Sequence, residues 1–248
     1  MRIGIFSDVH GNIHALRQVY AFYDQQQIDS YICLGDVVGY GPDPNLCVTL
    51  VRERVQHCIM GNHDAAVGGQ MDYAYYYDAV RTALDHHSSQ LSAENMLWLR
   101  SLPYQVIDDN RCYSHGSPIN PQAFDYVFNL SQAHGLLRHW DSLSDITFIG
   151  HSHLTKSYVL RVSPEGRTAR EIPADRLVLE PGRKYVCTVG SVGQPRDNDA
   201  RACCTIFDTS DLSLTWFRLD YDVSEAAAAI FSQENLSANF GKRLFLGI

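Results

Sequence analysis

Five short strings rich in Asp, Asn and His each directly follow a run with the apolar character of a buried β-strand. The strings are Asp8-Val9-His10, Gly35-Asp36, Gly61-Asn62-His63-Asp64, Ser114-His115-Gly116 and Gly150-His151-Ser152-His153. Ligands of open α/β sheets bind outside the carboxyl ends of the strands, so these distant residues are expected to converge there. Asp and His suit divalent metals of intermediate hardness. The pattern therefore predicts a two-metal site, with hydrolysis of a phosphate ester as the leading function.

The strand and helix patterns predict an α/β fold. Strands at 2–7, 31–34 and 55–60 alternate with helices, one from 13 to 26 capped by Asn12, which predicts a parallel sheet with right-handed crossovers. Residues 65–103 interrupt this alternation and are expected to form a helical insertion. Further strands are expected at 104–107, 111–114, 146–149, 157–162, 185–192, 202–208 and 212–221, helices at 71–87, 92–102 and 224–238, and polar turns at 163–183. Because we find no linker or internal repeat, residues 1–248 are expected to form a single domain.

The composition is that of a soluble globular protein. A chain of 248 residues with 45% hydrophobic and 19% charged residues can bury a large core. The net charge of −8 argues against bulk binding to a nucleic-acid polymer or an anionic membrane. We find neither a signal-peptide pattern nor an apolar run that could span a bilayer. Seven scattered cysteines favour reduced core thiols and a cytoplasmic location.

The spacing within the strings supports a metal site. Asp8 and His10, like His151 and His153, are separated by one residue, so a backbone that turns out of a strand can aim both side chains into one crevice. Gly35 permits close approach before Asp36. Each string alone is most simply a turn, but five in this order, each at a strand end, indicate metal ligands.

With these five motifs the chain resembles the calcineurin-like metallophosphoesterase superfamily, whose motifs are D-x-H, G-D, G-N-H-[DE], H and G-H-x-H. It resembles the small prokaryotic phosphodiesterase branch through GDVVGYGPDPN, the helical pair after GNHD, YSHGSP and VGSVGQPRD. The resemblance implies a four-layer α/β/β/α sandwich of two packed, mostly parallel or mixed sheets with a small helical cap.

The resemblance also implies a ligand set for two divalent metal ions, with Mn expected and Fe, Zn, Ni or Co as alternatives. One ion would be held by Asp8, His10, Asp36 and His153, and the other by Asp36, Asn62, His115 and His151, with Asp36 bridging. A metal-bridging hydroxide would attack phosphorus. His63 would lie beside the phosphate, with Asp64 orienting its imidazole. Asn62, His63 and Arg196, which ends the glycine-rich loop 190–196, are the expected substrate contacts.

The chain differs from the protein serine/threonine phosphatase branch of this superfamily, and the differences narrow the range of expected substrates. Gly39 and Tyr40 occupy the Asp-Arg positions of that branch, and Asp64 replaces its Glu, so the arginine fork that clamps phosphate is missing. A small, nucleotide-like phosphodiester is the expected substrate. The alternatives are hydrolysis of dinucleoside polyphosphates or other nucleotide anhydrides, and a non-catalytic nucleotide sensor or scaffold on the same fold. The sequence leaves the oligomeric state open, with a homo-oligomer as one alternative.

Three weaker features have competing interpretations. The tyrosines at positions 73, 75, 76 and 77 are expected to pack the insertion on the domain, although a cap that stacks on a nucleobase is the functional alternative. His86 and His87 are interpreted as a solvated helix end rather than as metal ligands. Arg201 is a poorer candidate than Arg196 for contacting phosphate.

Overall fold

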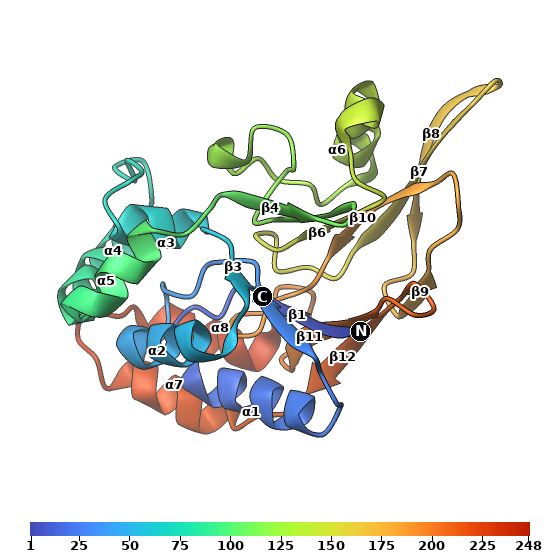
Figure 1. The fold of residues 1–248 in the computed structure, drawn as a ribbon. Coiled ribbons are helices and arrows are strands. Elements are labelled where there is room, and N and C mark those ends of the chain that lie inside the picture. Colours follow the sequence, from blue (N-terminus) through green and yellow to red (C-terminus); the bar gives the residue numbers. More distant parts are fainter.

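Two six-stranded mixed sheets pack face to face, and helices cover their outer surfaces (Figure 1). The computed structural model describes residues 1–248. A cluster of 17 buried side chains, including Ile5, Phe148 and Phe207, fills the space between the sheets. A larger cluster of 27 lies between the first sheet and its helices. The α/β/β/α sandwich implied by the sequence resemblance is therefore confirmed.

The first sheet carries the N-terminal strands. It contains β1 Arg2–Phe6, β2 Ser30–Cys33, β3 His57–Cys58, β9 Arg176–Val178, β11 Ala202–Asp208 and β12 Ser213–Leu219. Its order is β3-β2-β1-β11-β12-β9. The first three strands are parallel, as predicted, while β11, β12 and β9 add on antiparallel. The C-terminal ends of β1, β2 and β3 therefore meet at one edge.

The second sheet supplies the other wall of the sandwich. It contains β4 Gln105–Asp108, β5 Arg111–Ser114, β6 Ile146–Ile149, β7 Ser157–Ser163, β8 Gly166–Ile172 and β10 Lys184–Thr188. Its order is β4-β5-β6-β10-β7-β8, and β5, β6 and β10 are parallel. The ends of β5 and β6 face the same edge as the ends of β1 to β3, so both sheets contribute to one site.

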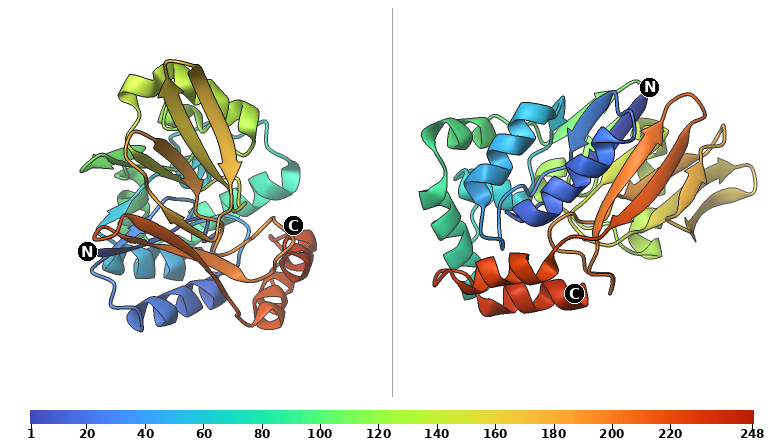
Figure 2. Two further views of the ribbon diagram at one scale, coloured as in Figure 1. Left: turned by 90° about the vertical axis from the view of Figure 1, so that its right-hand side faces the viewer. Right: turned by 90° about the horizontal axis from the view of Figure 1, so that it is seen from below.

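Helices form the outer layers. The α-helices are α1 Ile13–Asp24, α2 Pro44–Arg54, α3 Asn62–Val67, α4 Asp78–Gln90, α5 Ala93–Arg100, α6 Leu130–Gly135, α7 Val223–Phe231 and α8 Ala238–Leu246, with 3₁₀ segments η1 Pro121–Ala123 and η2 Leu136–Ser142. Asn12 caps α1 by accepting a hydrogen bond from Ala15 N, and Ser92 caps α5 in the same way. In Figure 2 the pair α7 and α8 lies beside the insertion helices, and Ala83 of α4 packs in their shared core.

Several predicted boundaries were wrong. The helix expected from residue 71 begins only at Asp78, because Tyr73 to Tyr77 form a turn in which Tyr76 N donates to Tyr73 O. Consecutive aromatic residues lose side-chain freedom in a helix, which disfavours the longer element. The last predicted helix, 224–238, ends at Phe231, and a further helix that was not predicted begins at Ala238, where Ser237 caps it. The strand expected to reach residue 192 ends at Thr188, and Gly190 then adopts a φ of +77°.

Strands β8 and β9 lie in the segment 163–183, which we predicted to be polar turns. Most residues of β8 are exposed, so the strand shows none of the apolar alternation by which a half-buried strand is recognised. It pairs only with β7, and this hairpin projects from the body of the molecule (Figure 1).

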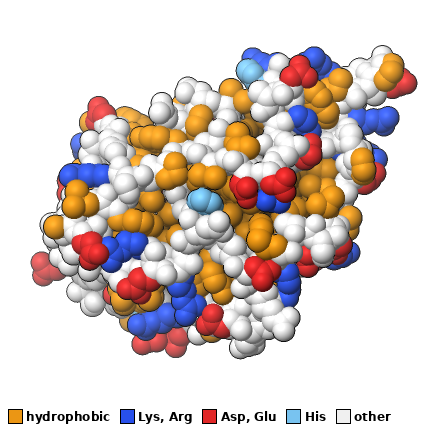
Figure 3. All heavy atoms as spheres, viewed as in Figure 1, with side chains coloured by type: hydrophobic (Ala, Val, Ile, Leu, Met, Phe, Trp, Pro, Cys, Tyr) orange, Lys and Arg blue, Asp and Glu red, His pale blue; other side chains and the backbone are white.

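The buried cysteines and the distribution of surface charge agree with the expectations drawn from the composition. All seven cysteines are buried free thiols, as expected. On the face shown in Figure 3, acidic and basic side chains are interspersed, with no continuous basic area. Every helix is too short or too polar to cross a bilayer.

Candidate metal centre and its cleft

The loops after five strands bring the seven predicted ligand residues together. Asp8 and His10 follow β1, Asp36 follows β2, Asn62 follows β3, His115 follows β5, and His151 and His153 follow β6. All seven side chains are buried. Residues separated by more than 140 positions in the sequence are in contact, because the two sheets present these strand ends to each other.

Five of these residues adopt a left-handed backbone conformation, which non-glycine residues rarely do. Their φ angles lie between +48° and +65°, and the residues are Asp8, His10, Asp36, His151 and His153. Such a conformation costs on the order of 1–3 kcal/mol per residue and tends to occur at functional sites. Here it turns each side chain out of its strand direction into the crevice.

One group of ligand atoms comes from the ends of β1 and β6. His10 Nε2 lies 3.0 Å from His153 Nε2, and His153 Nε2 lies 3.4 Å from Asp8 Oδ1. Atoms that bind the same metal ion lie about this far from one another, so the spacing of these two nitrogens and the carboxylate oxygen suits coordination of one ion. Asp8, His10 and His153 therefore form one potential metal site.

The second group contains Asp36, His115 and His151. His115 Nε2 lies 3.3 Å from Asp36 Oδ2 and 3.1 Å from Asn62 Oδ1. Asp36 Oδ2 also lies 3.7 Å from His10 Nε2, so this carboxylate stands between the two groups. Gly61 permits this arrangement, because a Cβ there would lie 2.1 Å from Asp36 Oδ1.

Backbone carbonyls fix the orientation of three imidazoles. The Nδ1 atoms of His10, His115 and His153 lie 2.9, 2.7 and 2.6 Å from the carbonyl oxygens of Val38, Leu34 and Gln194, respectively. An N–H donated to a carbonyl leaves the Nε2 lone pair free to bind a metal, and metal-bound histidines are commonly held in this way. The donor set thus fits divalent metal ions.

Burial and charge set the protonation of these groups. Burial lowers the pKa of His10, His151 and His153 well below the usual range, which favours the neutral imidazole that binds metals. Burial also opposes ionisation of Asp36, but the neighbouring imidazoles outweigh it and hold the pKa of Asp36 low. Conversely, Asp36 raises the pKa of His115 to about 10 in spite of burial.

His63 lies beside the predicted metal ligands, but Asp64 does not orient it. The His63 ring is 4.9 Å from the His10 ring, and its Nδ1 has no hydrogen-bond partner. The carboxylate of Asp64 instead accepts hydrogen bonds from the backbone N–H groups of Val37, Val38 and Gly61. Asp64 therefore positions the loops that carry Asp36 and Asn62, and its predicted contact with the imidazole was wrong.

Burial lowers the pKa of His63 to about 4, although Asp36 opposes this shift. Its imidazole is therefore neutral near pH 7. Transfer of a proton from His63 would require the negative charge of a bound substrate to raise this pKa.

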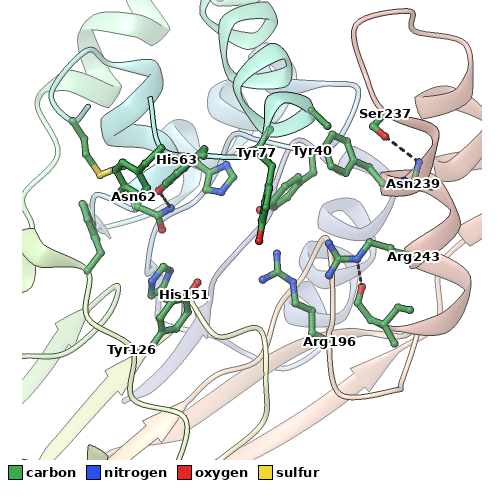
Figure 4. A pocket seen from close by; sticks show the side chains of 18 of the residues that line it. Tyr40, Asn62, His63, Tyr77, Tyr126, His151, Arg196, Ser237, Asn239 and Arg243 are labelled. Carbon is green, nitrogen blue, oxygen red and sulfur yellow. Dashed lines mark hydrogen bonds between the residues drawn. The ribbon is translucent and has the colours of Figure 1, made fainter. Parts of the chain in front are cut away.

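A cleft of about 1040 Å³ opens above the ligands. Its walls come from the insertion, the segment 123–126 and helix α8, and Figure 4 shows the side chains that face it. Asn62, His63 and His151 line its floor. Tyr126 stacks on His151, with ring centroids 3.8 Å apart and planes inclined by 11°.

The tyrosine cluster divides between packing and the cleft. Tyr73 donates a hydrogen bond to Asp85 and packs against the core, as the structural interpretation predicted. Tyr76 accepts a hydrogen bond of 2.7 Å from Asn62 Nδ2. Tyr75 and Tyr77 are 74% and 87% exposed and line the cleft.

Arg196 faces the cleft, whereas Arg201 does not. The guanidinium of Arg196 lies 5.7 Å from the centre of the Tyr40 ring and donates to Gln194 Oε1. Arg201 pairs with Asp199 at the surface and lies outside the cleft lining.

His87 is fully buried, so its interpretation as part of a solvated helix end was wrong. Its Nδ1 accepts a hydrogen bond from Gly39 N, and its Nε2 donates to Gly41 O, both at 2.9 Å. The imidazole thereby fixes the loop that carries Tyr40. His86 is partly buried, with its Nε2 3.2 Å from Gln233 Oε1.

Sequence reasoning missed Tyr40, Tyr126 and Arg243 as residues of the cleft. Arg243 belongs to no motif and lies beyond residue 238, where the last predicted helix ends. The loop containing Tyr40 was noted for its resemblance to one branch and for the arginine that it lacks relative to another, but not as part of a cleft.

The chain belongs to the calcineurin-like phosphoesterase family, whose model matches residues 1–187. An uncharacterized protein of Methanocaldococcus jannaschii is 34% identical over 252 residues, covering 99% of this chain and 98% of the relative. The crystal structure of a metallophosphoesterase from Sphaerobacter thermophilus matches with a TM-score of 0.84 and 32% identity, over 100% and 99% of the two chains.

A hypothetical protein from Pyrococcus horikoshii OT3 shares the fold, with a TM-score of 0.76 and 19% identity over 100% of this chain and 98% of its own. The match of the family model to residues 1–187 confirms the family predicted from the sequence motifs.

Proposed function

We propose that the protein hydrolyses phosphodiester bonds of small, nucleotide-like substrates by means of two divalent metal ions, with Mn²⁺ as the first candidate. The supporting observation is the position of Asp36. Its Oδ2 lies 3.7 Å from His10 Nε2 in one ligand group and 3.3 Å from His115 Nε2 in the other. A two-metal site needs such a shared ligand, because its ions lie only about 3.5–4 Å apart.

The bound ions would polarise the phosphoryl group and lower the pKa of an attacking water. The chain supplies the positioning. Asp8 accepts the backbone N–H of His151, and Asp36 accepts that of His63 at 2.8 Å, so the carboxylates also hold the loops in register. Asn62 and Arg196 face the cleft as substrate contacts. His63 lines the floor of the cleft, where its ring would face a phosphoryl or leaving-group oxygen, while its Nδ1 is buried beside Gly39.

The size of the cleft supports a diester over a monoester. A volume of about 1040 Å³ exceeds the needs of one phosphate and accommodates a group on each side of phosphorus. Its lining includes 13 hydrophobic residues, which suits an organic substituent such as a nucleoside.

Hydrolysis of bis(p-nitrophenyl) phosphate tests this proposal. The Mn²⁺-loaded protein should release p-nitrophenol and lose this activity in EDTA, and Asp36→Asn should reduce it most. Asp141→Asn removes an exposed carboxylate on η2 and serves as the control. Undiminished activity in EDTA would overturn the proposal. Preference for dinucleoside polyphosphates would favour an anhydride hydrolase, and nucleotide binding without turnover would favour a sensor.

Replacement of His63 tests its role. His63→Ala should retain its metal ions while kcat falls by about 10²–10⁴, the usual contribution of general acid catalysis. The loss should be smaller for a p-nitrophenolate leaving group than for a nucleoside alcohol, because p-nitrophenolate scarcely needs a proton. Equal losses would assign His63 to electrostatic positioning. Loss of metal would place it among the ligands.

A further inference from the structure

The wall of the cleft formed by α8 carries positive charge, and no Asp or Glu side chain lies among the lining residues beside it. Arg196, Lys242 and Arg243 line the cleft, and its 21 lining residues include neither Asp nor Glu. This is unexpected in a chain with a net charge of −8. Neither Arg196 nor Arg243 takes part in an ion pair with an acidic side chain, whereas many other arginines do, among them Arg111 and Arg218.

The two guanidinium groups lie next to each other. Figure 4 shows Arg196 and Arg243 side by side below Tyr77. Arg243 Nε donates to the backbone oxygen of Ile248 at 2.7 Å, and Arg196 Nε is buried without a partner. Both side chains are partly buried. Adjacent like charges repel, and partial burial strengthens the repulsion, so an anion between them would relieve it.

Arg243 is set apart from the metal ligands, whereas Arg196 lies closer to them and donates its backbone N–H to His153 O at 3.2 Å. No hydrogen bond or ion pair joins Arg243 to any of the seven ligand-type residues, and it reaches the cleft from α8 rather than from a strand end. At the proposed two-metal site, a phosphate would already be neutralised by two dications. The arginines are therefore suited to a different negative charge on the same molecule.

The aromatic side chains between these two positions indicate what connects the charges. Tyr40 lies between the floor and the arginines, 4.7 Å from the His63 ring and 5.7 Å from the Arg196 guanidinium. Tyr77 is 87% exposed and points into the same space (Figure 4). Exposed aromatic faces of this kind can stack on a planar base.

We propose that Arg196 and Arg243 form an anion subsite for a second phosphate of the substrate, carried by the same nucleotide as the phosphate that is hydrolysed. This inference rests on the proposed function, from which it takes the nucleotide-like substrate. The preferred substrate is then a nucleotide that carries a second phosphate in addition to the one that is hydrolysed. Two guanidinium forks can bind one phosphate through several charge-assisted hydrogen bonds.

Equilibrium binding to the Mn²⁺-loaded protein tests the subsite without turnover. The probes are AMP, α,β-methylene-ADP and adenosine 3′,5′-bisphosphate, measured by calorimetry. The wild-type protein should bind at least one of the two doubly phosphorylated probes 10-fold or more tightly than AMP. Arg243→Ala and Arg196→Gln should each reduce this preference to less than threefold, and Arg243→Lys should retain part of it.

Lys242→Ala is the matched control, because it removes the same charge from the neighbouring residue. It should leave the preference within about twofold of the wild-type value, since Lys242 is exposed and water of high dielectric constant weakens the effect of its charge. Equal loss in Lys242→Ala, or no preference in the wild type, would overturn the subsite. Because binding is measured without hydrolysis, a failed phosphodiesterase assay with an intact preference would overturn only the proposed function.

Discussion

At the scale of single residues, the site depends on backbone conformations that residue type alone does not dictate. Asp8, His10 and Asp36 have φ angles of +55°, +48° and +51°. The energetic cost of these conformations is met by the surrounding structure, since each loop is held by backbone hydrogen bonds such as Asp8 N to Gly35 O. The surrounding fold thus orients the side chains of these predicted ligands.

Tyr76 is a positioning residue for a predicted ligand. Its hydroxyl accepts the Asn62 amide N–H at 2.7 Å, which leaves Asn62 Oδ1 directed toward His115. We expect Tyr76→Phe to weaken Mn²⁺ binding about 10–100-fold, as loss of a partner that orients a metal ligand commonly does. Calorimetric titration measures the change. Tyr73→Phe, whose hydroxyl contacts Asp85, is the control, and equal affinities in the two variants would contradict the assignment.

Residue types and their spacing were enough to predict the ligand-type residues, but not the residues that surround them. The ligand-type residues could be predicted because five strings repeat one chemistry at strand ends. The role of Asp64 could not, because a carboxylate next to His63 is equally able to bind an imidazole or three backbone N–H groups, and only the path of the loop decides. Arg243 could not be predicted either, since tertiary packing alone brings α8 to the cleft.

At the scale of elements, patterned segments were predictable and exposed or short ones were not. Strands β1, β2 and β6 are continuous buried runs and were identified. Strand β8 is held by its pairing with β7 while most of its side chains face solvent, so its sequence contains no burial signal. The division between α7 and α8 depends on a single cap, Ser237.

His87 connects α4 to the loop that carries Tyr40, and we expect its contribution to stability to depend on pH. Burial lowers the pKa of His87 to about 3, and its neutral ring bonds both Gly39 and Gly41. The unfolded chain therefore binds more protons below a pH of about 6.5, so stability contributed by His87 is present at neutral pH and lost as pH falls toward 3. Between pH 7 and pH 5 we expect this loss to be about 2 kcal/mol.

Urea unfolding of the metal-free wild type and of His87→Gln at both pH values checks this. The variant should be less stable at pH 7, and its free energy of unfolding should fall less on acidification. The difference between the two proteins removes contributions from the other buried histidines. Parallel losses in both proteins would mean that His87 does not titrate on unfolding.

At the scale of the whole molecule, the candidate metal centre joins the two sheets. Asp8, His10, Asp36 and Asn62 follow strands of the first sheet, whereas His115, His151 and His153 follow strands of the second. Between the sheets lies an apolar core, but at this edge buried carboxylates and imidazoles meet instead. Metal ions bound by both sets would connect the sheets where hydrophobic packing is absent.

Metal removal should therefore lower the stability of the entire fold. An ion present at about 1,000 times its Kd stabilises the native state by about 4 kcal/mol, which corresponds to about 8–16 °C in Tm for a domain of this size. We expect Mn²⁺ to raise the Tm of EDTA-treated protein by at least this amount. Asp36→Asn should show a much smaller rise, because the shared carboxylate is lost from both ligand groups, whereas Asp141→Asn should respond like the wild type. A Tm independent of Mn²⁺ in the wild type would show that the ligand residues of the two sheets do not bind metal together.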